Sequence, residues 1–78
     1  MDVDNRIKIG RAELNLTQEE LAKKIGVSRQ TINSIEKNRY VPSTVLALKL
    51  SELFEKSVNE IFILEESDFE EKYQKEIV

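Results

Sequence analysis

Apolar residues recur every three or four positions along most of the chain, which is the spacing of one buried face of a helix. No run alternates apolar and polar residues as a strand would. The residues that carry the helical spacing are Leu21, Ala22, Ile25, Ile32, Ile35, Leu46, Leu50, Leu53, Phe54, Val58, Ile61 and Phe62. With residues 4–14 as a first helix, the pattern predicts an all-α fold of five short helices within residues 4–62.

Polar residues mark where the predicted helices begin and end. Four of them stand where they can cap a helix start, two with a glutamate three residues later as in a capping box. They are Thr17 (with Glu20), Ser28, Ser43 (after Pro42) and Ser57 (with Glu60). Three residues that accept a left-handed backbone stand where helices should end, namely Asn15, Gly26 and Asn38.

Residues 17–36 form the most informative unit of the pattern. Two helices joined by only Gly26-Val27-Ser28 must cross steeply, which is the geometry of a helix-turn-helix. The outward positions of the second helix are Arg29, Gln30, Thr31, Asn33 and Ser34. An ordinary solvated helix face is rich in Glu and Lys, whereas these side chains can read base edges or hold phosphate. The unit therefore indicates DNA binding.

The composition restricts the alternatives. Seventy-eight residues suffice for one small domain, and the absence of cysteine and histidine excludes disulfides and the common zinc sites. It also removes the usual general base at neutral pH. We expect no catalytic residues, no metal, no cofactor, no evident small-molecule effector and therefore no enzyme. No apolar run approaches the ~20 residues that span a bilayer, so a cytoplasmic protein without membrane contact is expected.

The net charge of −3 seemingly contradicts a DNA partner, but its distribution does not. Residues 65–78 hold six acidic residues against two basic ones, whereas residues 1–64 hold nine acidic against ten basic. Between residues 28 and 39, Arg29, Lys37 and Arg39 face only one acidic residue, Glu36. The expected organisation is a domain of residues 1–64 with a short basic face, followed by an acidic amphipathic extension of residues 65–78.

The stretch LNLTQEELAKKIGVSRQTINSIEKNRYVPS resembles the Cro and phage-repressor family of helix-turn-helix proteins, also called the XRE family. The resemblance covers about residues 5–62 and implies a lambda-repressor-like domain. It also implies a transcriptional regulator, most often a repressor, that binds a double-stranded DNA operator as a homodimer. The helix from Ser28 would then lie in the major groove.

The resemblance assigns roles to individual residues. Thr17 and Gln18 match positions at a backbone phosphate. Ser28, Arg29, Gln30, Thr31 and Ser34 match base-facing positions, and Asn33 lies at the groove edge. Lys37, Asn38 and Arg39 match a loop along phosphates, while Arg11 and Glu36 match a structural ion pair. The sequence departs from the family at Gly10, which weakens the first helix and thins its core contact, at Asn38, and at Glu55-Lys56, where a glycine is common.

Three questions stay open in the sequence. Ile61 to Leu64 could finish the fifth helix or form a strand across a dimer axis. In the extension, Phe69, Tyr73 and Ile77 form one apolar stripe that could dimerise, pack on its own domain or belong to a frayed tail. A protein-interaction module on the same fold is the alternative function, and repressor or activator is undecided.

Overall fold

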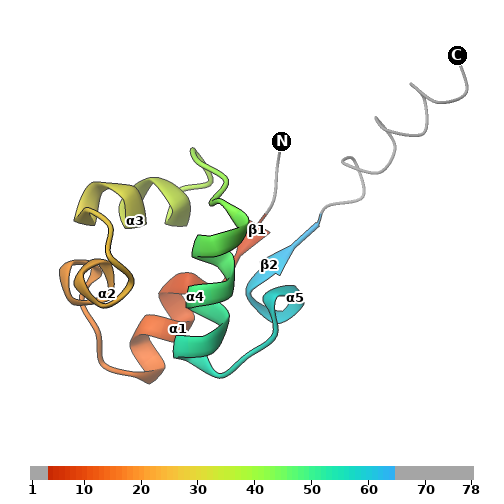
Figure 1. Ribbon diagram of the computed structural model, residues 1–78, viewed down its shortest axis with the longest axis horizontal. Helices are drawn as coiled ribbons and strands as arrows, with labels where there is room; N and C mark the ends of the chain where they lie inside the picture. The colour runs from red at the N-terminus through yellow and green to blue at the C-terminus, as the bar shows by residue number, and fades with distance from the viewer. Residues whose placement is uncertain (1–3, 65–78) are drawn as a thin grey trace, which may run out of the picture.

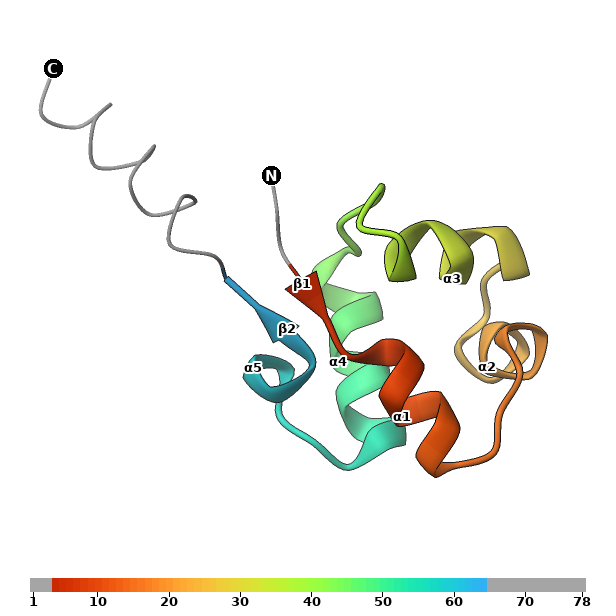
Figure 2. The same cartoon turned by 180° about the vertical axis from the view of Figure 1, so that it is seen from behind.

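A computed structural model describes residues 4–64 of the chain. Its helices are α1 (Ile7–Glu13), α2 (Gln18–Ile25), α3 (Arg29–Glu36), α4 (Thr44–Phe54) and α5 (Val58–Ile61). In Figures 1 and 2, α1 and α4 lie in the middle of the domain, with α2 and α3 on one side and α5 on the other. The five predicted helices are confirmed. Within the described residues, no helix has the length and apolar character needed to cross a membrane.

The prediction of a helix over residues 4–14 is wrong at its start. Strand β1 (Asp4–Asn5) pairs antiparallel with strand β2 (Phe62–Ile63), and α1 begins only at Ile7. The backbone N–H of Arg6 donates to the Ile61 carbonyl at 2.8 Å, which ties the two segments together next to the ladder. The apolar run after Ile61 thus forms a strand that pairs with β1 of the same chain, which corrects the expectation that it continues α5.

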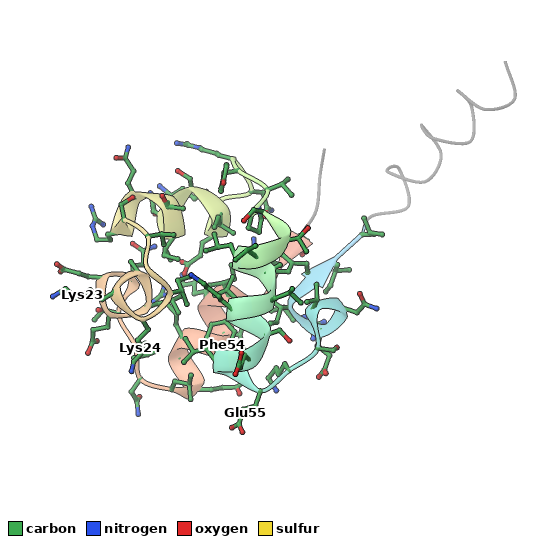
Figure 3. All side chains as sticks on the ribbon, in the orientation of Figure 1. Lys23, Lys24, Phe54 and Glu55 are labelled. Carbon is green, nitrogen blue, oxygen red and sulfur yellow. The ribbon has the colours of Figure 1, made fainter. Side chains whose placement is uncertain are left out.

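The core contains most of the apolar residues that carried the helical pattern, together with Ile7; Leu53 and Phe62 are partly buried against it. Its buried members are Ile7, Leu21, Ala22, Ile25, Ile32, Ile35, Leu46, Leu50, Phe54 and Ile61. Gly10 is buried too, because a Cβ there would lie 2.9 Å from Cε2 of Phe54. Figure 3 shows Phe54 at the end of α4, beside α1. The expectation that Gly10 thins the core contact is therefore wrong, since the Phe54 ring occupies that space.

The predicted caps and left-handed residues account for the helix ends. Both capping boxes form: Glu20 N–H donates to Thr17 Oγ1 at 3.1 Å, and Glu60 N–H donates to Ser57 Oγ at 3.2 Å. Asn15, Gly26, Asn38 and Glu55 have positive φ values of 56°, 76°, 58° and 54°. Glu55 thus ends α4 in the conformation that a glycine would adopt. The predicted stripe of Phe69, Tyr73 and Ile77 lies outside the described residues.

Candidate nucleic-acid interface

The crossing of α2 and α3 is set by the turn between them. Gly26 adopts the left-handed conformation that ends α2, and its N–H donates to the Ala22 carbonyl. Val27 is half-buried against the core, and Ser28 then caps α3. Because Ile32 and Ile35 point into the core, the other side of α3 is left for solvent or a ligand.

The start of α3 presents side chains that differ in how freely they can move. Ser28 Oγ accepts the backbone N–H of Thr31 at 3.1 Å and lies 2.9 Å from the Thr31 hydroxyl. These two residues are therefore already engaged with each other. Arg29 and Gln30 are exposed and have the length to reach beyond the helix surface.

Arg11 and Glu36 form an ion pair between α1 and α3. Arg11 Nε donates to Glu36 Oε2 at 2.6 Å and its Nη2 donates to Oε1 at 3.1 Å, with side chains only 14% and 8% exposed. Arg11 also donates to the Leu16 carbonyl at 3.0 Å. The hydrogen bond to Glu36 raises the pKa of Arg11 above its ordinary value. The one carboxylate of α3 is thus turned inward and neutralised.

Gln18 connects this ion pair to the outer side of α3. Its Nε2 donates to Glu36 Oε1 at 3.2 Å and to Asn33 Oδ1 at 3.3 Å, while its Oε1 accepts from Arg29 Nη1 at 3.4 Å. Both amide N–H groups are therefore engaged inside the protein, and Asn33 is half-buried beside them. Sequence reasoning placed Gln18 next to phosphate but did not foresee this chain of contacts from Arg11 to Arg29.

The loop after α3 brings Lys37, Asn38 and Arg39 to the surface next to the helix. Arg39 N–H donates to the Ser34 carbonyl at 2.9 Å, which folds the loop back along α3. Sequence reasoning missed two residues here. Asn5 donates to this region from β1, and Tyr40 lines the same hollow as Ser34 and Arg39. An aromatic residue in an otherwise polar loop was the available signal for Tyr40.

The predicted contact residues therefore gather on one side of the domain. Thr17 and Gln18 start α2, the residues from Ser28 to Ser34 lie on α3, and the cationic loop continues from its end. A helix-turn-helix family profile matches residues 7–61, which is most of the chain. The chain belongs to the XRE-type helix-turn-helix family of DNA-binding proteins. This assignment confirms the predicted fold and the prediction that the chain is not an enzyme.

Similar proteins of this helix-turn-helix family extend over nearly the same length. A Methanocaldococcus jannaschii protein named an uncharacterised HTH-type transcriptional regulator is 53% identical over 64 residues, covering 82% of this chain and 97% of that protein. An Archaeoglobus fulgidus protein of the same description is 49% identical, covering 86% and 94%. A crystal structure of a putative DNA-binding protein from Bacteroides fragilis superposes with a TM-score of 0.69 at 31% identity, covering 78% of this chain and 98% of that chain.

Proposed function

We propose that this helix-turn-helix protein is a sequence-specific transcriptional regulator that inserts α3 into the major groove of double-stranded DNA. The observation that carries the proposal is the charge of the exposed surface of α3. Its single acidic residue, Glu36, is paired with Arg11 and almost fully covered, so only cationic and neutral groups face outward. Such a surface can approach a polyanion without repulsion.

The proposed DNA contacts are of two kinds: some side chains read base edges, and others contact phosphates and position the protein. Arg29 can donate twice to guanine N7 and O6, and Gln30 can pair with adenine N6 and N7. Thr31 and Ser34 supply shorter donors on the same side, Ser28 begins the helix, and Asn33 lies at its edge. Positioning falls to residues that can meet phosphates: Thr17, Gln18, Lys37, Asn38 and Arg39. A phosphate contact by the Gln18 amide requires it to exchange one of the two hydrogen bonds that its Nε2 donates inside the protein.

A homodimer follows from the small size of one recognition helix. A single helix reads few base pairs, so two copies of α3 about 34 Å apart are needed for useful affinity. An apolar groove of about 230 Å³ beside α4 offers the contact; it is lined by Val41, Pro42, Thr44, Ala47, Leu48, Val58 and Phe62. We place the second copy on this groove, together with the extension of residues 65–78.

Repression is the mode that the domain can perform by itself. A dimer seated on DNA blocks access to the occupied base pairs, and this requires no surface for an activating partner. We infer a prokaryotic cell from the family and the cytoplasm as the place of work, because the proposed DNA target lies there. An adaptor function on the same fold is disfavoured, because a protein-binding version of α3 would present apolar or acidic residues where Arg29, Gln30 and Ser34 stand.

The test is selection of duplexes from a random pool, followed by titration of the selected operator and a scrambled duplex at several salt concentrations. We expect a two-fold symmetric site, preferred over the scrambled duplex by ~10³-fold or more. The logarithm of the binding constant should fall linearly with the logarithm of the salt concentration. Equal affinity for both duplexes, or no binding, overturns the proposal and leaves the adaptor function.

A further inference from the structure

A shallow trough of about 410 Å³ lies between the exposed side of α3 and the loop that follows this helix. Its lining residues are Ser28, Gln30, Thr31 and Ser34 on α3 and at its cap, and Arg39 and Tyr40 on the loop. Each of these side chains carries a hydrogen-bonding group, and the only ion among them is the cation Arg39. The trough therefore fits a ligand that is anionic and rich in acceptors, as a sugar–phosphate strand is.

Tyr40 forms the outer part of the loop wall. The residue is 47% exposed, and it borders both the trough and a small gap next to Ile35, Asn38 and Pro42. Tyr40 thus stands between the body of the domain and the trough. Tyrosine combines an apolar body with a hydroxyl at its tip, which suits a position with one dry side and one wet side.

Asn5 fixes the loop from the other end of the chain. Its Nδ2 donates to the Ile35 carbonyl and to Asn38 Oδ1, each at 2.8 Å. Its own backbone is held in register opposite Phe62 in the β1–β2 ladder. The left-handed turn at Asn38 is therefore anchored before any DNA arrives. A wall that is ordered in advance loses little conformational freedom on binding.

We propose that one sugar–phosphate strand of the operator runs along the loop side of the trough, at Arg39 and Tyr40, and that the Tyr40 hydroxyl donates a hydrogen bond to a phosphate oxygen there. Asn5 is the positioning residue that holds the Tyr40 wall. The proposal rests on the DNA-binding function proposed above and adds two residues to it. Because the hydroxyl is neutral, its contact reads no base and releases no counterion.

The first measurement is the affinity of Tyr40→Phe for the selected operator. We expect a loss of about three- to tenfold, the usual size of one neutral hydrogen bond. The loss should be equal across single-base operator variants, and the salt dependence should not change. Ile9→Ala, at a residue 56% exposed on α1, is the control for a change at an exposed site and should bind like the wild type.

Asn5→Asp tests the positioning role, because it keeps the acceptor that receives the Ile7 N–H at 3.3 Å and removes the donors to the Ile35 carbonyl and to Asn38 Oδ1. Asn5→Ala removes the donors without adding charge. Both variants should weaken operator binding, and Tyr40→Phe should cost less in either background than in the wild type. If the losses of operator affinity in the double variants are additive, Asn5 does not position Tyr40. Circular dichroism verifies that both variants fold. If neither folds, Asn38→Gly tests the positioning role, because glycine keeps the left-handed turn and removes the acceptor of the Asn5 hydrogen bond.

Operators with single phosphates replaced by neutral methylphosphonates locate the contact. At one position the replacement should reduce the operator affinity of the wild type more than that of the Tyr40→Phe variant. At the other positions it should reduce the affinity of both proteins equally. If the wild type discriminates between sequences but Tyr40→Phe binds the operator as tightly as the wild type, only this inference is overturned. A loss confined to one base pair also overturns it, since Tyr40 would then read sequence. A wild type that does not discriminate between duplexes overturns the proposed function itself.

Discussion

Two faces of this domain differ in the interactions that their side chains make. The polar face consists of the start of α2, the outer side of α3 and the loop of residues 37–40, and hydrogen bonds link it from Arg11 through Glu36 and Gln18 to Arg29. The apolar face consists of the groove beside α4 and the exposed side chains next to it, including Val45 and Leu48 at 64% and 56% exposure. The two faces meet at Tyr40 and Val41, neighbours on one loop.

The difference teaches how one small domain can prepare two kinds of contact. Directional hydrogen bonds hold the side chains from Arg11 to Arg29 before a ligand binds, which suits a partner with fixed charges such as DNA. An apolar surface has no such directional requirement and gains free energy only when another apolar surface covers it. Large exposed apolar patches are uncommon on monomers and typical of interfaces between proteins. We therefore propose DNA as the partner of the first face and a second copy of the chain as the partner of the other.

The largest expected effect comes from breaking the ion pair under the polar face. Glu36→Ala leaves the Arg11 guanidinium almost covered without its counter-charge, and should lower the free energy of unfolding by about 3 kcal/mol. Glu52→Ala, at an exposed position of α4, is the matched control and should be close to neutral. Urea unfolding measures both. Equal midpoints for the two variants would show that the pair contributes nothing.

The apolar face is tested by placing a charge on it. Leu48→Glu should leave the fold intact and separate the dimer, because an unpaired carboxylate cannot enter a dry contact cheaply. Loss of the second half-site should then weaken operator binding by ~100-fold or more. Ile9→Glu puts the same charge on an exposed apolar position of α1 and serves as control. Analytical ultracentrifugation would contradict the assignment if both variants sedimented like the wild type.

Sequence reading by the polar face is tested one base pair at a time. Arg29→Ala and Gln30→Ala should each relax the preference at one operator position by about 1–3 kcal/mol. Gln18→Ala should weaken all sequences alike through the phosphate, and should also reduce the cost of Arg29→Ala, since Gln18 Oε1 lies 3.4 Å from Arg29 Nη1. The measurement is a matrix of variants against single-base operators. Uniform losses for both Arg29→Ala and Gln30→Ala would move sequence reading to Thr31, Asn33 and Ser34.

The smallest expected effect is a pH dependence of stability from the capping-box glutamates, and it should be the same at Glu20 in α2 and at Glu60 in α5. Hydrogen bonds from the backbone and then the hydroxyl of Thr17 lower the pKa of Glu20, and those of Ser57 lower the pKa of Glu60. A lowered folded-state pKa stabilises the protein above the ordinary pKa of about 4.5 and loses this contribution as the pH falls through the folded value. Thermal midpoints of Glu20→Gln and Glu60→Gln should thus trail the wild type at pH 7 and approach it at pH 3. A constant gap would exclude the carboxylates as its cause.

Local chemistry in the sequence determined the helices, their caps and the helix-turn-helix. Each of these depends on residues within one or two turns of each other, as with Thr17 and Glu20 or the left-handed Gly26. The helical spacing also placed Ile32 and Ile35 inside and Arg29 and Gln30 outside, so the composition of the polar face was available before the structure. The outward side chains of residues 29–34 already indicated DNA binding, and the resemblance added the family and the roles of individual residues.

Only the tertiary structure decided what depends on residues far apart in the chain. Asn5 reaches Ile35 in α3 thirty residues away, and residues 4–5 pair with Phe62–Ile63 instead of starting α1. The sequence alone suggested that Gly10 weakens the core contact, whereas in the structure the ring of Phe54 fills the space next to its Cα. Tyr40 became a wall of the trough only when the loop folded back on Ser34. Periodicity reports which face a residue occupies, whereas the partner across that face is set by packing that no local pattern encodes.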